Sequence, residues 1–175
     1  MKRIIAVAIF ALGLPALAQH RPYEGQEGRE IKALSAEEVK QYLAGAGMGY
    51  AKAAELNSFP GPQHALELAD KLGLSDEQRA ATRRLMDEHK AEARAIGAKL
   101  VEAERRLDAL FRRGKVGAEE LAAGVREAAT LQGEYRLSHL ETHRRLRAIL
   151  TDAQVAKYDV LRGYTSKSGR SGHKH

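Results

Sequence analysis

Apolar residues at seven-residue spacing run through residues 75–113 and limit the fold more than any other feature of the chain. One row holds Met86, Ala93, Leu100 and Leu107, and a second holds Ile96, Ala103 and Leu110. Two such rows form the seam of a coiled-coil-like amphipathic helix. A second seam, between 118 and 150, holds Leu121, Val125, Ala128, Gln132, Tyr135, His139, Thr142, Leu146 and Ile149. Because only Gly114-Lys115-Val116-Gly117 separate the two segments, the two helices must lie antiparallel.

Three capping boxes predict where helices begin. In each box a side-chain hydroxyl and a carboxylate or amide three residues later satisfy free backbone N–H groups. The pairs are Ser35 with Glu38, Ser75 with Gln78, and Thr151 with Gln154. Pro62 suits the first position of a further helix that stops at Gly73. No run of alternating β-branched and aromatic residues competes, so we expect an all-α fold: a long antiparallel helical hairpin with short flanking helices.

The first residues are typical of a secretory signal peptide. A basic start at Lys2-Arg3 precedes an apolar run from Ile4 to Leu14 and a small-x-small end at Ala16-Leu17-Ala18. The run is shorter than the roughly 20 residues that a transmembrane helix needs, although an uncleaved anchor is the alternative. We therefore expect cleavage after Ala18, a periplasmic location and no stable membrane anchor. The remaining chain divides into a flexible leader with one short helix (19–60), the hairpin domain (61–164) and a disordered tail (165–175).

Composition excludes several functions. The chain has no cysteine, which rules out disulfides, thiolate metal sites and cysteine nucleophiles. Its net charge of +6 comes from basic residues that alternate with acidic ones, and only 5% of residues are aromatic, so we expect no nucleic-acid partner. There is no glycine-rich phosphate loop, no serine nucleophile elbow and no HExxH motif. We expect a protein that is not an enzyme.

Two of the helix starts carry a resemblance. Leu74-Ser75-Asp76-Glu77-Gln78 and Leu150-Thr151-Asp152-Ala153-Gln154 resemble the two LTxxQ motifs of a periplasmic family, with Ser75 where threonine is usual. That family includes the Spy and CpxP envelope-stress chaperones and periplasmic heavy-metal sensor and resistance proteins. The resemblance covers about residues 62–164. It implies a Spy/CpxP-like hairpin, often a homodimer, that holds unfolded client proteins or binds transition metal through histidine and carboxylate.

Four histidines form the predicted metal site. His139 and His143 are four residues apart, so both imidazoles lie on one helix face and can share one metal ion. If the hairpin turns near residue 115, His89 lies on the opposite helix at the same level, and the helix that carries His64 can fold back over this end. Histidine with carboxylate favours Zn, Ni, Co or Cu(II). The expected carboxylates are Asp87, Glu88 or Glu92. A hydrogen-bonded core histidine is the alternative for each residue alone.

A second candidate surface lies near the hairpin turn. It combines apolar and basic side chains, namely Leu107, Leu110, Phe111, Arg112 and Arg113. An apolar surface rimmed by positive charge can hold extended client chains, although a plain hairpin core with a solvated face is the alternative. The leading prediction is a periplasmic envelope-stress protein that binds transition metal for sensing or resistance. The alternative is an ATP-independent holdase, and an envelope signalling protein is a further possible partner.

Overall fold

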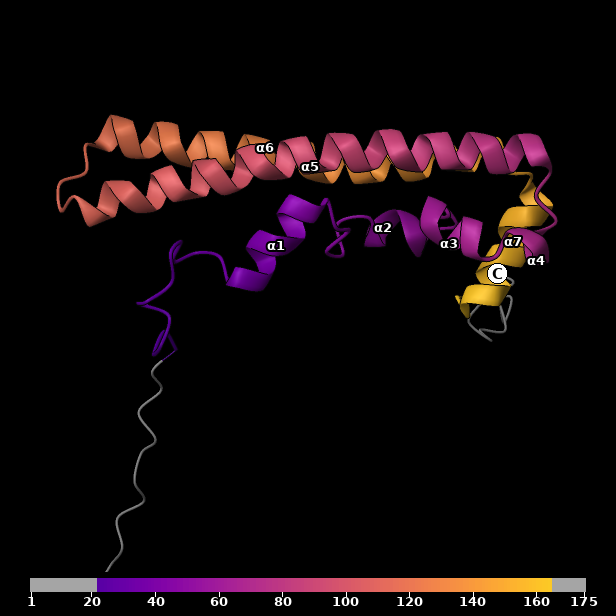
Figure 1. Ribbon diagram of the computed structural model, residues 1–175, viewed down its shortest axis with the longest axis horizontal. Helices are drawn as coiled ribbons and strands as arrows, with labels where there is room; N and C mark the ends of the chain where they lie inside the picture. The colour runs from indigo at the N-terminus through magenta and orange to yellow at the C-terminus, as the bar shows by residue number, and fades with distance from the viewer. Residues whose placement is uncertain (1–21, 165–175) are drawn as a thin grey trace, which may run out of the picture.

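The computed structural model describes residues 22–164, and within them the chain forms helices joined by turns, with no strand (Figure 1). The helices are α1 (Ala36–Ala44), α2 (Lys52–Glu55), α3 (Pro62–Glu67), α4 (Ala69–Leu72), α5 (Asp76–Arg112), α6 (Ala118–Ile149) and α7 (Asp152–Arg162). The all-α prediction is confirmed. The predicted signal peptide and C-terminal tail lie outside the described residues. None of the helices in residues 22–164 is long and apolar enough to cross a membrane.

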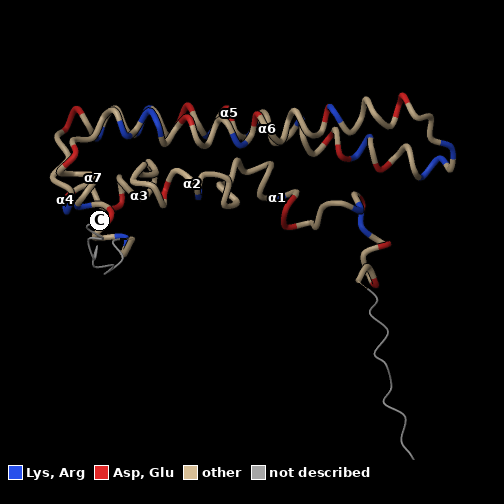
Figure 2. The backbone as a smooth tube through the Cα atoms, turned by 180° about the vertical axis from the view of Figure 1, so that it is seen from behind, with Lys and Arg blue, Asp and Glu red and all other residues tan. Residues whose placement is uncertain are grey.

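Helices α5 and α6 form the predicted antiparallel hairpin (Figure 1). Their register is visible in ion pairs across the hairpin: Arg106 to Glu127 at 2.7 Å and Arg145 to Glu88 at 2.9 Å. Basic and acidic residues alternate along both helices instead of forming a run of one sign (Figure 2). The buried apolar side chains form two clusters along the hairpin, and these are the two parts of the core. Leu146, Leu150 and Tyr158 lie in the part near α7.

The two glutamines of the cap motifs meet at the open end of the hairpin. Gln78 and Gln154 donate to each other's side-chain oxygens, at 2.9 Å in both directions. Gln78 also donates to the carbonyl of Ile149 at 3.0 Å, and Gln154 to that of Gly73 at 3.3 Å. Both still complete their capping boxes. The two motifs therefore begin α5 and α7 and also join these two helix starts to each other.

The segment before the hairpin packs along it (Figure 1). Ile31 and Tyr42 are 2% and 5% exposed and lie in the second part of the core. Helix α1 approaches α5 at Gly97, where an added Cβ would lie 2.1 Å from the carbonyl oxygen of Tyr42. We predicted a flexible leader with one short helix over residues 19–60; its described part, residues 22–60, carries both α1 and α2. The helix predicted over 62–72 is interrupted at Leu68, which separates α3 from α4.

Candidate functional site

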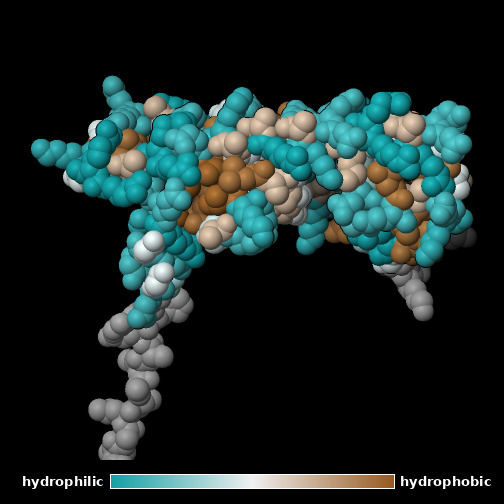
Figure 3. Space-filling model, viewed as in Figure 1, coloured by the Kyte–Doolittle hydropathy of each residue, from teal (hydrophilic) through white to brown (hydrophobic). Residues whose placement is uncertain are grey.

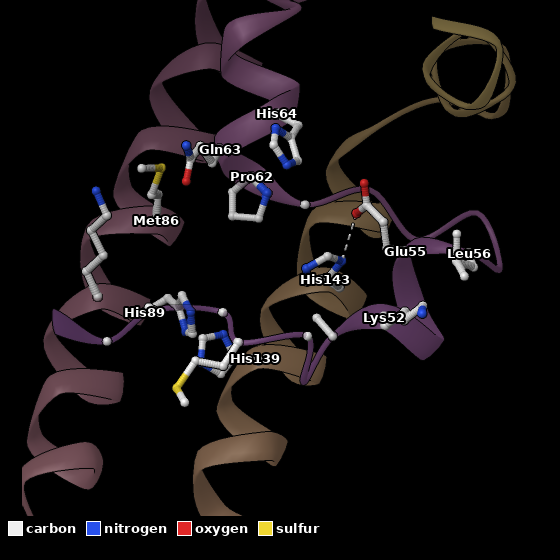
Figure 4. A pocket seen from close by; sticks show the side chains of 18 of the residues that line it. Lys52, Glu55, Leu56, Pro62, Gln63, His64, Met86, His89, His139 and His143 are labelled. Atoms are coloured by element: carbon white, nitrogen blue, oxygen red, sulfur yellow. Dashed lines mark ion pairs between the residues drawn. The ribbon is translucent and has the colours of Figure 1, made fainter. Parts of the chain in front are cut away.

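A cavity of about 560 Å³ lies between the hairpin and the chain segment that returns from α1 to α3 (Figure 4). All four histidines of the predicted metal site line it: His64, His89, His139 and His143. His89 comes from α5 and His139 and His143 from α6, so the register of the hairpin brings them together. His64 comes from α3, which packs against α5 as the sequence led us to expect.

His89 and His139 form the inner pair of the cavity. Their ring centroids are 4.4 Å apart with the planes at 72°, and His139 is only 4% exposed. Burial, followed by the charges of His89 and His143, lowers the pKa of His139 to about 4. Burial also lowers the pKa of His89, with smaller effects from His143 and Lys90. Both rings are therefore neutral at pH 7, which is the form that binds a metal ion.

Each ring of this pair keeps one nitrogen without a hydrogen bond. Nδ1 of His89 and Nε2 of His139 are buried and have no partner among the described residues. Buried polar side-chain atoms nearly always have a partner, and each exception calls for an explanation such as a bound ion. Neutral imidazole nitrogens are good ligands for Zn, Ni, Co and Cu(II). The inner pair therefore offers two imidazole nitrogens to a transition-metal ion.

His143 is the second histidine of the i, i+4 pair, and its tautomer follows from its partners. Its Nδ1 lies 2.8 Å from the carbonyl oxygen of Phe59 and 3.6 Å from Oε2 of Glu55. A carbonyl only accepts, so Nδ1 carries a hydrogen and donates it to Phe59. Figure 4 shows Nδ1 turned toward Glu55 and Nε2 on the opposite side of the ring. His143 thus lines the cavity with Nδ1 engaged by the Phe59 carbonyl and Nε2 outside that bond.

His64 stands apart from the other three. Its side chain is 37% exposed, and its Nδ1 lies 3.0 Å from Oε2 of Glu67 in the same helix. Within residues 22–164 no three histidine or acidic side chains stand close enough together to hold one ion. The cavity therefore gathers the four predicted histidines, while only His89 and His139 touch.

The carboxylate at the cavity differs from the expected ones. Asp87, Glu88 and Glu92 do not line it, and Glu88 instead pairs with Arg145 at 2.9 Å. Glu55 of α2 lines the cavity in their place. No periodicity or cap marks this four-residue helix, so the sequence contained no signal for Glu55. Met48 and Met86 also line the cavity, and they place two thioethers beside the imidazoles.

The other oxygen of Glu55 connects the cavity to α7. Oε1 accepts from the hydroxyls of Tyr158 at 2.5 Å and Tyr164 at 3.0 Å, and Nε of Arg162 lies 3.6 Å away. Tyr158 is fully buried. Burial, followed by the hydrogen bond and charge of Glu55, raises the pKa of Tyr158 above its ordinary value of 10.0. The Tyr158 hydroxyl therefore remains a donor to Glu55 at neutral pH.

The predicted client-binding residues lie at the far end of the hairpin from this cavity. Leu107 and Leu110 are half-buried, and Phe111 is 59% exposed. Arg112 pairs with Asp108 at 3.1 Å and Arg113 with Glu120 at 2.6 Å, so neighbouring acids offset the basic rim. At ~1.5 Å rise per residue, Phe111 lies on the order of 30 Å along α5 from His89.

Comparison with protein families gives a match to the heavy-metal resistance family over residues 42–157. The matched segment contains the four cavity histidines and both cap motifs. Comparisons with curated proteins and with solved structures gave no match. Since the matched segment covers more than half of the chain, the protein belongs to the heavy-metal resistance family.

Proposed function

We propose that the protein binds a divalent transition-metal ion in the histidine cavity and serves metal resistance or sensing without catalysing a reaction. One observation carries this proposal: two neutral imidazoles lie in contact, and each has a buried nitrogen with no hydrogen-bond partner among the described residues. Membership of the heavy-metal resistance family supports it independently.

The donor set suits Zn, Ni, Co and Cu(II). His89 and His139 would be the first ligands, and Nε2 of His143 would be the third. Imidazole suits all four ions, and a bound ion would stabilise the native chain because the unfolded chain cannot gather these residues. A bound ion would supply charge and cross-linking in the cavity. Burial by the chain's own residues keeps His89 and His139 neutral.

Calorimetric titration with each of the four ions tests the proposal. The full chain would carry His20→Ala, His173→Ala and His175→Ala, so that every remaining histidine lies in the cavity. We expect micromolar or tighter binding that disappears when His139 and His143 are both changed to alanine.

Glu141→Ala is the matched control for this titration. Glu141 lies between the two histidines on α6, but its carboxylate pairs with Arg144 at 2.6 Å, away from the cavity. We expect this variant to bind as the wild type does. Absence of binding by the wild-type cavity, or binding that survives the double histidine change, contradicts the proposal.

A holdase is the second candidate function, and exposed apolar side chains on the long helices favour it. Phe111, Val125 and Leu137 are 59%, 48% and 63% exposed. Apolar atoms also gather on the surface over α1 and again near α3 and α7 (Figure 3). In a client-aggregation assay a holdase would weaken when Leu110, Phe111, Arg112 and Arg113 are altered. It would tolerate the loss of His139 and His143.

Location and assembly are part of the same proposal. A periplasmic homodimer, facing unfolded clients or an envelope signalling partner, agrees with the predicted signal peptide and with the family resemblance. Cell fractionation and sedimentation of the purified chain test these two points. A cytoplasmic protein or a monomer at high concentration would contradict them.

A further inference from the structure

The inner histidine pair offers fewer ligands than a metal ion normally takes. Among the described residues, His89 and His139 each have one buried nitrogen without a partner. Within residues 22–164 no three histidine or acidic side chains stand close enough to share an ion, so His143 joins the pair only if its ring moves from the carbonyl of Phe59. Closed zinc sites have four protein ligands, and open ones usually have three. Two imidazoles therefore leave most of the coordination sphere to donors from outside the chain.

The cavity beside this pair is much larger than a bare ion needs. Its volume is about 560 Å³, whereas one water molecule takes ~30 Å³ of the liquid. Cavities that hold small organic molecules typically measure about 300–1,000 Å³. Gly47 and Gly49 form part of the wall, and an added Cβ at either position would meet nothing within 4 Å. The cavity thus has room for an organic ligand beside the two imidazoles.

Positive charge predominates in the lining of the cavity. Lys52, Lys90 and Arg162 line it together with a single acidic residue, Glu55. Arg162 lies 3.6 Å from Glu55, so these two charges offset each other. Lys52 and Lys90 are exposed, and their ammonium groups form no ion pair or hydrogen bond among the described residues. Free positive charge at the rim attracts an anion and repels a bare metal cation.

We propose that the cavity binds its transition-metal ion as a complex with a small polycarboxylate chelator. This inference rests on the proposed metal-binding function and names the form in which the ion is bound. Binding is a ligand exchange: two water molecules leave the complex, and the free nitrogens of His89 and His139 take their places. Both rings are neutral before and after the exchange, so no proton is released. Lys52 and Lys90 then attract the carboxylates of the chelator.

The first test compares nickel(II) probes by calorimetry on the full chain with His20→Ala, His173→Ala and His175→Ala. Nitrilotriacetate leaves two coordination positions of nickel(II) open, and EDTA leaves none. We expect the nitrilotriacetate complex to bind about 10-fold tighter than hydrated nickel(II), because charge-assisted hydrogen bonds to its carboxylates add to the two nitrogens. The EDTA complex should not bind. Equal or tighter binding of the hydrated ion, or equal binding of the EDTA complex, would overturn the inference.

The second test asks whether the inner pair completes the complex. His89→Ala and His139→Ala should each abolish tight binding of nickel(II) nitrilotriacetate, and Glu141→Ala should not. Circular dichroism checks that each variant keeps its helices. In the parent chain, the visible absorption of nickel(II) should move to shorter wavelength, because imidazole replaces water. An unchanged spectrum in the bound state would mean that charge alone holds the complex, which contradicts the inference.

The third test uses the sign of the charge. Lys52→Gln with Lys90→Gln should weaken binding of the anionic nitrilotriacetate complex about 3-fold or more, and should leave hydrated nickel(II) binding unchanged or tighter. Lys99→Gln is the matched control, because Lys99 is exposed on α5 but does not line the cavity. It lies on the order of 15 Å along α5 from His89, at ~1.5 Å rise per residue. Unchanged affinity of the double lysine variant for the complex would contradict the role of the basic rim.

Repeating the first comparison with zinc(II), cobalt(II) and copper(II) separates this inference from the proposed function. If none of the ions binds in either form, the proposed function fails and this inference fails with it. If a hydrated ion binds through His139 and no nitrilotriacetate complex binds tighter than its hydrated ion, only the inference about the chelator is refuted.

Discussion

Replacing Gln78 with alanine tests whether the two cap motifs do more than begin helices. The Gln78 carboxamide accepts from the backbone N–H of Ser75 at 3.1 Å and donates to the carbonyl of Ile149 at 3.0 Å. It also forms the reciprocal pair with Gln154. Alanine removes all of these bonds and leaves Ile149 and Gln154 with fewer partners in a half-buried place.

The expected loss follows from these contacts. Four hydrogen bonds, each worth about 0.5–1.5 kcal/mol net, give a decrease of about 2–6 kcal/mol in the free energy of unfolding. Glu38→Ala is the matched control, because Glu38 completes the capping box of α1 with Ser35 and its carboxylate forms no hydrogen bond with another helix start of the described residues. That variant should lose only a cap, about 1 kcal/mol. The double variant of Gln78 and Gln154 should show a coupling energy of about 1–2 kcal/mol.

Urea unfolding, followed by circular dichroism, measures these energies, with linear extrapolation at an unchanged slope. The result that refutes the reasoning has two parts. Gln78→Ala would destabilise no more than Glu38→Ala, and the cycle of Gln78 with Gln154 would give a coupling energy near zero. Each motif would then be a helix start alone, and the hairpin would close through its apolar core.

Three further predictions concern packing, pH and metal. Gly97→Ala should destabilise the chain by about 3 kcal/mol in thermal unfolding, because the added methyl group would meet the carbonyl of Tyr42. Gly133→Ala, on the open surface of α6, should stabilise the chain by about 1 kcal/mol. Equal effects of the two substitutions would contradict the close approach of α1 to α5. The pKa of His139 is about 4 in the native state and 6.5 in the unfolded chain, so unfolding takes up a proton between these pH values. The free energy of unfolding should therefore fall as the pH drops from 6.5 to 4. His139→Gln should show a smaller dependence of this free energy on pH. A chelator should lower the melting temperature of the metal-loaded protein. If the free metal concentration is about 100-fold above the dissociation constant before the chelator is added, the lost stabilisation is about 2.7 kcal/mol. An unchanged melting temperature would contradict metal binding.

Much of the fold follows from local patterns. The seams placed the long helices over about 75–113 and 118–150, and the structure has α5 at Asp76–Arg112 and α6 at Ala118–Ile149. The short connection also set the register closely enough to bring His89 to His139. Cap chemistry and apolar periodicity act over one or two helical turns, so the sequence displays them directly.

The carboxylate of the site could not be predicted in the same way. Asp87 and Glu88 were expected because they lie near His143 in the register of the hairpin, and Glu92 because it lies near His139, but each is exposed on α5. Glu55 reaches the cavity through a return of the chain after three glycines at 45, 47 and 49, and no periodic pattern sets its path. The path depends on long-range contacts, such as the hydrogen bonds from Tyr158 and Tyr164 to Glu55.

The sequence by itself determined the helices, the antiparallel hairpin and the histidines that gather on it, because turn length and seam spacing leave one arrangement of two long helices. Metal binding, export and dimerisation stay predictions. Only the tertiary structure decided that Gln78 pairs with Gln154, that α1 packs at Gly97, and that Glu55 lies beside His143. These contacts join residues more than 50 positions apart, and which of them form depends on packing the whole chain at once.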